Sequence, residues 1–186
     1  MRNTDIQQHE RVPGRVVYHP IGIIHTPFTQ PEGMPIQSVR SEAAGWVALD
    51  AQYRPALTDL DGFSHIILIY HFHQAGSPQL TVKPFLDDTA HGVFATRHPH
   101  RPNPVGLSVV RLDRVELGDP PILHVTGVDM LDGTPLLDIK PCTPAFDVHP
   151  ATRTGWMGTQ GESLTERPWR AHFGAGSQTN GPDAEV

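Results

Sequence analysis

The sequence contains little cysteine and no long apolar run. Cys142 is its only cysteine, so no disulfide can form within the chain. A protein without disulfides is most simply placed in the reducing cytoplasm. No stretch of about 18 apolar residues is present, and the polar N-terminus lacks a secretory signal, so we expect neither a membrane span nor export.

The chain also lacks positive net charge and a glycine-rich phosphate loop. Its formal net charge is −6 at pH 7, whereas proteins that bind nucleic acid over their whole surface are usually basic. Any RNA binding must therefore use a local patch, or a dimer that gathers such patches. Because no glycine-rich loop follows a strand and opens a helix, a Rossmann-type cofactor fold has no support.

What the chain does contain suits one domain with a hydrophobic core. Hydrophobic residues make up 38% of the sequence, which is sufficient for a single core. We expect a flexible N-terminal arm at 1–15, a β-barrel domain at 16–149 and a loosely packed tail at 150–186. In the tail, Trp156, Trp169 and Phe173 are the side chains able to pack back on the body.

Strand signals outnumber helix signals. The 19 prolines argue against long helices, and the best helix candidate is the short segment Ala51–Leu60. Short β-branched segments separated by turn residues favour an all-β barrel or sandwich. The predicted strands are Val16–Ile24, Trp46–Leu49, His65–Phe72, Gly92–Ala95, Leu107–Val115 and Ile122–Met130.

For two of these strands the sequence also predicts which side chains are buried in the core. His65–Phe72 is nearly continuous in apolar residues, which is typical of a strand buried on both faces. In Leu107–Val115 the partial alternation predicts that Leu107 and Val109, with Leu112 as a further candidate, face the core and that Ser108 and Arg111 face outward.

The segment Arg97–Ser108 is stiffened by proline. Three prolines stand within six residues, which fixes the backbone and forbids both helix and ladder pairing. Arg97, Arg101 and Asn103 are thus held on a rigid loop at low entropic cost. Arginine binds carboxylates through paired hydrogen bonds, so this loop suits an anionic group. The alternative is a rigid connector with solvated arginines.

The segment Asp129–Pro141 combines a tight turn with a polar strand face. Asp132 and Gly133 form a turn signal, and Asp138 and Lys140 fall on one face of the strand that follows. At a surface the two would form a weak ion pair. In a cleft, Asp138 could orient a substrate amine or accept its proton.

Two further segments have open interpretations. His71 and His73 are spaced like a pair of metal ligands, but a site would need a third ligand from His65, His91, His98 or His100. We therefore expect histidines that hydrogen-bond in or near a pocket, and no metal. Met34–Arg40 has the composition of an ordinary surface loop.

Read together, these motifs resemble a known family. The order IGIIHTPF, MPIQ, LDGFSHIILIYHFHQ, GVFATRHPHRPNPVGLS and DMLDGTPLLDIKP is similar to the TsaA-like family of TrmO-type methyltransferases, over Val17 to Asp147. The resemblance implies a small non-Rossmann β-barrel with one or two short helices. It also implies a homodimer that binds S-adenosylmethionine near the subunit interface and methylates the exocyclic amine of threonylcarbamoyl-adenosine beside the anticodon of tRNA.

The resemblance and the two loops together give the candidate site. The proton acceptor would be Asp138 or, as the second candidate, His73. Two other readings stay open: a methyltransferase of the same fold acting on a small molecule, and a non-catalytic S-adenosylmethionine-binding module. The candidate cofactor-binding residues are Gln37, Ser38, Phe72, His73, Arg97, Arg101, Asn103, Leu107, Asp129, Met130, Leu131 and Asp132.

Overall fold

A computed structural model describes residues 11–12, 14–85, 87–150 and 153–158. Its strands are β1 (Arg11–Val12), β2 (Arg15–Val16), β3 (Gly22–His25), β4 (Ala44–Leu49), β5 (His65–His71), β6 (Thr81–Val82), β7 (His91–Gly92), β8 (Val105–Glu116), β9 (Ile122–Thr126) and β10 (Thr134–Pro141). Its helices are the short 3₁₀ segments η1 (Ser38–Arg40), η2 (Ala51–Leu57), η3 (Leu60–Gly62), η4 (Val93–Ala95) and η5 (Gly155–Met157), and the single α-helical turn α1 (Pro144–Asp147).

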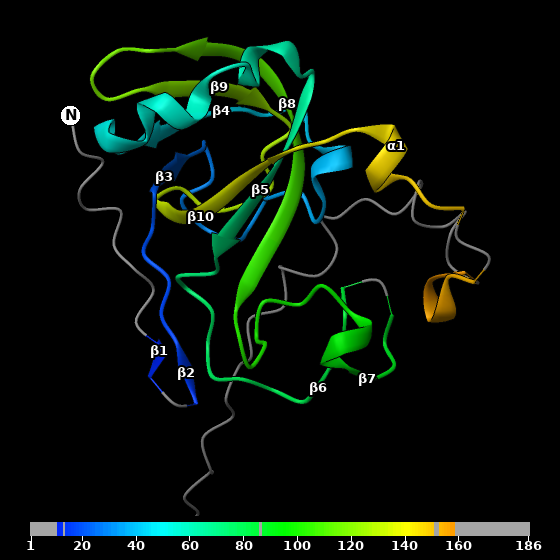
Figure 1. Cartoon of the computed structure of the whole chain (residues 1–186). Coiled ribbons are helices and arrows are strands. Elements are labelled where there is room, and N and C mark those ends of the chain that lie inside the picture. Colours follow the sequence, from blue (N-terminus) through cyan, green and yellow to red (C-terminus); the bar gives the residue numbers. More distant parts are fainter. Residues whose placement is uncertain (1–10, 13, 86, 151–152, 159–186) are drawn as a thin grey trace, which may run out of the picture.

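Six of the strands close a barrel (Figure 1). They run in the order β10-β3-β4-β9-β8-β5, with every neighbouring pair antiparallel. Closure comes from β3, which pairs with β4 on one side and with the late strand β10 on the other. The predicted all-β barrel with few short helices is therefore confirmed. Within the described part of the chain, no helix is long and apolar enough to cross a bilayer.

The barrel interior is filled by alternate residues of these strands. Each strand contributes every second side chain, as the pleat requires, and the enclosed side chains form one contiguous core. Its fully buried members include Ile24, Val47, Leu49, Ile66, Leu68, Val110, Leu123, Val125 and Leu136.

The first half of β8 faces the opposite way from the prediction, whereas Leu112 faces inward and Arg111 outward as predicted. Ser108 is 2% exposed and faces the interior, whereas Leu107 is 51% exposed and faces outward with Val109. The reason lies beside Gly106, where a Cβ atom would overlap the Tyr70 ring, so only glycine fits under this tyrosine. The Tyr70 hydroxyl lies 3.0 Å from Ser108 Oγ, so the buried serine has a polar partner.

Several element predictions are corrected in detail. The segment predicted as strand Gly92–Ala95 contains only Gly92 in β7, and Val93–Ala95 forms a 3₁₀ helix instead. The predicted helix Ala51–Leu60 is a pair of 3₁₀ segments, with Pro55 inside the first. Strand β5 alternates buried and partly exposed positions, so it is fully buried on one face only.

Trp156 of the tail packs against the body. Its Nε1 donates to the Ala95 carbonyl over 2.8 Å, and its ring stacks on His91 with 4.6 Å between ring centroids. These contacts hold η5 against β7 and η4, the elements that precede the proline-stiffened segment. Trp169 and Phe173, predicted as further anchors, lie outside the described residues, as does most of the predicted N-terminal arm.

Candidate functional site

The proline-stiffened segment and the loop before β10 meet inside one end of the barrel. Ser108 Oγ donates to Asp129 Oδ1 over 2.5 Å. Since the serine hydrogen is used there, the Tyr70 hydroxyl must donate to Ser108 Oγ. The result is a hydrogen-bond relay from Tyr70 through Ser108 to the Asp129 carboxylate.

The Asp129 carboxyl has a strongly shifted pKa. Burial raises the pKa of its carboxyl to about 6, against the opposing effects of the Ser108 hydroxyl, the Ser38 backbone N–H and the Arg97 charge. Burial and the neighbouring Asp129 charge also raise the pKa of Tyr70, so this phenol stays protonated as a donor. Asp129 is therefore mostly ionised at neutral pH, and its negative charge is incompletely compensated.

A positive charge lies beside this carboxylate. Arg97 Nη1 donates to Gln37 Oε1 over 2.7 Å, and the Arg97 charge lowers the pKa of both Asp129 and Tyr70. Gln37 immediately precedes η1, whose first residue gives its N–H to Asp129. One cluster thus offers a guanidinium and a carboxylate side by side, as the recognition of a zwitterion requires.

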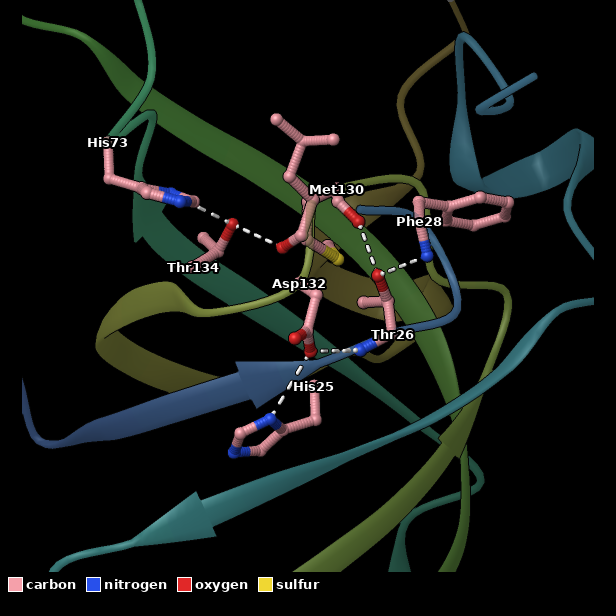
Figure 2. Close-up of polar contacts among 8 residues, drawn as sticks. His25, Thr26, Phe28, His73, Met130, Asp132 and Thr134 are labelled. Atoms are coloured by element: carbon pink, nitrogen blue, oxygen red, sulfur yellow. Dashed lines mark hydrogen bonds and ion pairs between the residues drawn. The ribbon is translucent and has the colours of Figure 1, made fainter. Parts of the chain in front are cut away.

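The loop between β9 and β10 is fixed by hydrogen bonds on both sides (Figure 2). Asp132 Oδ1 accepts from the Thr26 N–H over 3.0 Å and lies 3.2 Å from His25 Nδ1. The Thr26 hydroxyl donates to the Met130 carbonyl over 2.9 Å. Gly133 has a φ of 76°, which confirms the predicted tight turn.

His73 lies at the same loop, next to β10 (Figure 2). The Thr134 hydroxyl donates to the Leu131 carbonyl, so His73 Nδ1, 3.3 Å from Thr134 Oγ1, must be the donor of their contact. This tautomer leaves Nε2 as the acceptor, 3.3 Å from the Gln74 amide nitrogen. Burial, followed by the charge of His71, lowers the pKa of His73, so its ring is neutral at pH 7.

Phe72 connects β5 to the proline-stiffened segment. Its N–H donates to the Pro104 carbonyl over 2.8 Å, and its ring meets Tyr70 edge to face with 5.3 Å between centroids. Met130 is buried in the core, so from this residue only the backbone is available to a ligand.

The described interactions of three predicted cofactor contacts lie outside the Arg97–Asp129 cluster. The Arg101 guanidinium donates to the carbonyls of Val93 and Thr96 and lies over the Phe94 ring, so it holds η4 in place. Leu107 points outward from β8, and the Asn103 carbonyl accepts from the Val105 N–H. Their assignment to the cofactor remains a prediction.

Asp138 lies in a different setting from the Arg97–Asp129 cluster. As predicted, it shares a strand face with Lys140, and the two form an exposed ion pair of 2.8 Å. Asp138 also lines an open groove of about 420 Å³ whose walls include Leu57 and Phe63, a groove to which the cluster contributes no residue. Among the residues that the structure describes, no three potential ligands are grouped as a metal site would require.

Sequence reasoning missed the inward polar pair of Tyr70 and Ser108. The signal was a single serine in an otherwise apolar segment, two positions after Gly106 and so on the same strand face. A serine of this kind indicates a buried polar contact only when the strand that pairs with it is known. Here the partner, Tyr70, lies 38 residues earlier in the sequence.

Comparison with known proteins identifies the family of the chain. Residues 23–148 match the family model described as the tRNA-methyltransferase O N-terminal domain. The chain belongs to this family. The predicted resemblance is thereby confirmed over most of the barrel.

Individual relatives support the same assignment. A probable S-adenosyl-L-methionine-binding protein of Pyrococcus abyssi is 52% identical over 147 residues, which is 78% of each chain. A tRNA (adenine(37)-N6)-methyltransferase of Mus musculus is 36% identical over 72% of this chain, but the match spans only 32% of the mouse protein.

Solved structures share the fold. A crystal structure of TrmO superposes with a TM-score of 0.63 and 40% identity, covering 75% of this chain and 62% of the other. TrmO from Pseudomonas aeruginosa gives 0.62 and 38%, with the same coverage. The present chain therefore spans less than two thirds of these solved structures.

Proposed function

We propose that this protein binds S-adenosylmethionine and transfers its methyl group to the exocyclic amine of adenine 37, the threonylcarbamoyl-bearing base beside the anticodon of tRNA. Support comes from the family, from a relative named as a tRNA (adenine(37)-N6)-methyltransferase and from a relative named as a cofactor-binding protein. The single observation that carries the proposal is a cluster at the end of a non-Rossmann barrel, in which Arg97 is held by Gln37 and its charge acts on the half-buried Asp129 carboxylate.

The residues of the cluster fit the cofactor by charge. S-adenosylmethionine supplies a methyl group activated by a sulfonium, and it also bears a carboxylate and an ammonium. Arg97, positioned by Gln37, would bind the carboxylate through charge-assisted hydrogen bonds. Asp129 would attract the cationic end, and the relay from Tyr70 and Ser108 would hold its carboxylate in place. Methyl transfer is then accelerated mainly by positioning.

His73 is the better placed of the two predicted proton acceptors. Its ring is neutral, its tautomer is fixed by Thr134, and its Nε2 is an acceptor whose exposed 3.3 Å contact with the Gln74 amide a substrate amine would have to replace. Asp138 is engaged by Lys140 beside a separate groove.

Replacing the two candidates separates their roles. We expect His73→Ala to lower kcat about 100-fold, a usual effect of removing a general base. Asp138→Asn should keep near-full turnover because its side chain lies away from the cluster. Single-turnover methylation of tRNA measures both, and a slow Asp138→Asn beside an active His73→Ala would reverse the assignment.

We also propose a homodimer acting in the cytoplasm. The outer face of β8 leaves Val105, Leu107 and Val109 exposed in one stripe, as a surface covered by a second copy would be. The reducing cytoplasm suits a chain whose only cysteine is unpaired. Light scattering of the purified chain tests the dimer, and a monomeric mass would exclude it.

The central test is the methylation of tRNA itself. Cells that lack the protein should lose the methylated form of threonylcarbamoyl-adenosine from their threonine tRNAs, as measured by mass spectrometry of tRNA nucleosides, and the wild-type gene should restore it. Purified protein should transfer labelled methyl to that tRNA in vitro. Cofactor binding without any tRNA product would instead support a small-molecule methyltransferase or a binding module.

A further inference from the structure

Four side chains form a continuous row across the outside of the barrel. His25 of β3 is the register partner of Trp46 on β4, Trp46 is the partner of His124 on β9, and His124 is the partner of Arg114 on β8. We call this row of two imidazoles, one indole and one guanidinium the ring ladder. Neighbouring strands lie about 4.8 Å apart, so consecutive members of the ladder are within contact distance.

The geometry of the ladder favours stacking. The rings of His25 and Trp46 lie 5.0 Å apart at an angle of 18°. Arg114 Nη2 lies 3.1 Å from His124 Nε2. A β-bulge between Leu112 and Arg114 shifts the register of β8, and this shift brings the arginine opposite His124.

Trp46 is a large aromatic residue on the outer surface of β4. It is 46% exposed, and its neighbours two positions away on the same strand face are Ala44 and Ala48. These small side chains cannot cover the indole. An exposed indole that stacks on one imidazole still offers ring surface on which planar groups stack.

The ladder begins at the candidate site. His25 Nδ1 lies 3.2 Å from Asp132 Oδ1, in the loop that also carries Asp129 (Figure 2). The row that starts with His25 and Trp46 is therefore joined to the loop that carries Asp129 and Asp132.

The charges around the ladder are paired but exposed. Arg114 lies 2.7 Å from Glu116, and Arg111 of the adjoining strand segment lies 2.7 Å from Asp113. Exposed pairs of this kind contribute little stability, so a phosphate can compete for both guanidinium groups. Because the whole chain is acidic, RNA binding must depend on such local contacts and on stacking instead of a general positive field.

We propose that the ring ladder is the docking surface for unpaired nucleotides next to the methylated base, with bases stacked on Trp46 and its flanking imidazoles and a phosphate held by Arg114. This inference rests on the proposed function, since it assigns the RNA-binding surface of the same site. Single-stranded RNA is the occupant that fits, because its unstacked bases pack on aromatic rings and guanidinium planes while its backbone pairs with arginine. The row runs perpendicular to the strands, so successive bases would lie over β3, β4 and β9.

Kinetics with tRNA test the ladder. Trp46→Ala should raise the KM for tRNA about tenfold, the usual effect of losing one base–aromatic stack, with kcat and the Kd of the cofactor within twofold of wild type. Trp46→Phe should restore most of the affinity because a ring remains. Phe146→Ala is the matched control, since this aromatic is 78% exposed on α1, away from the ladder.

The arginine is tested by salt dependence. Arg114→Ala should weaken the binding of an anticodon stem-loop RNA and lower the slope of log K against log salt by about one, as expected for one lost phosphate contact. Arg54→Ala, an exposed arginine that binds the Gly118 carbonyl, is the matched control and should leave the slope unchanged. Thermal melts of each variant verify that the barrel is folded.

The outcomes distinguish the ladder from the proposed function. If wild-type protein methylates tRNA and folded Trp46→Ala shows an unchanged KM, the ladder is overturned while the function stands. If no tRNA is methylated, the function fails, and stem-loop binding still tests the ladder: binding lost in Trp46→Ala supports it, whereas equal or absent binding overturns it. A change of oligomeric state in Trp46→Ala would instead assign this face to a second copy and overturn the proposal.

Discussion

Asp129→Asn should weaken cofactor binding strongly and at the same time make the protein more stable at neutral pH. Asp129→Asn removes the negative charge that would face the cationic end of S-adenosylmethionine but keeps an oxygen able to accept from Ser108. We expect the Kd of the cofactor to rise at least about 100-fold, because a charge-assisted contact of about 3 kcal/mol is lost. Isothermal titration calorimetry measures this loss, and a Kd near that of wild type would remove Asp129 from the site.

The gain in stability follows from the pKa of Asp129. Folding raises this pKa from about 3.9 to about 6, so ionising the carboxyl destabilises the fold as pH rises between those values, and the full penalty is present above pH 6. A shift of about two units corresponds to about 3 kcal/mol, reduced by the hydrogen bond from Ser38 that asparagine reproduces poorly. The variant should therefore be about 1 to 2 kcal/mol more stable than wild type at pH 7.5.

The pH dependence provides the control. Below pH 4 wild-type Asp129 is protonated in both states, so the advantage of Asp129→Asn should disappear there. Asp138→Asn removes an exposed acid of the same type and should show no comparable gain at pH 7.5. Urea unfolding at the two pH values measures both variants, and an equal gain at pH 4 would mean that burial of the charge is not its cause.

Arg97→Ala should weaken cofactor binding without affecting the fold. Arg97 donates to Gln37 at the surface of the cluster, and a charge-assisted pair with a carboxylate contributes about 1.5 to 3 kcal/mol. We therefore expect Arg97→Ala to raise the Kd of S-adenosylmethionine about 10- to 150-fold. Arg97→Lys should recover only part of this affinity, because an ammonium cannot form the two parallel bonds of a guanidinium.

Arg101→Ala is the informative contrast to Arg97→Ala. Arg101 binds the carbonyls of Val93 and Thr96, so its removal should lower the melting temperature more than the cofactor affinity. Calorimetry and thermal melts of both variants separate the roles. An unchanged Kd in Arg97→Ala, or a large cofactor defect in a fully stable Arg101→Ala, would contradict the placement of the cofactor carboxylate.

Much of the fold was accessible from local sequence signals. Short apolar segments, frequent proline and the turn at Asp132 and Gly133 act over a few residues, and they predicted an all-β barrel. Which residues of β8 face the core could not be predicted from the sequence. The outward-facing Val105, Leu107 and Val109 are more apolar than Gly106 and Ser108, which face inward. Hydrophobic alternation alone therefore selects the wrong face.

The site was predictable as a set of residues but not as an arrangement. The rigidity of the proline-stiffened segment and the charge of Arg97 could be read locally, whereas the contact from Ser108 to Asp129 depends on strand pairing across the barrel. The ring ladder is more remote still, because His25, Trp46 and His124 become neighbours only through the registers of three strands. Register is set by the whole core and not by any one segment.

The pairing of β3 with β10 also determines when the molecule can fold. Ile24 is the partner of Thr134, so the first barrel strand has no second neighbour until nearly the whole domain has left the ribosome. Contacts this distant in the chain form slowly, and until they form, the unpaired edges of β3 and β5 are free to pair with other nascent chains. Expression of this protein should therefore depend on chaperone capacity during synthesis more than its small size would indicate.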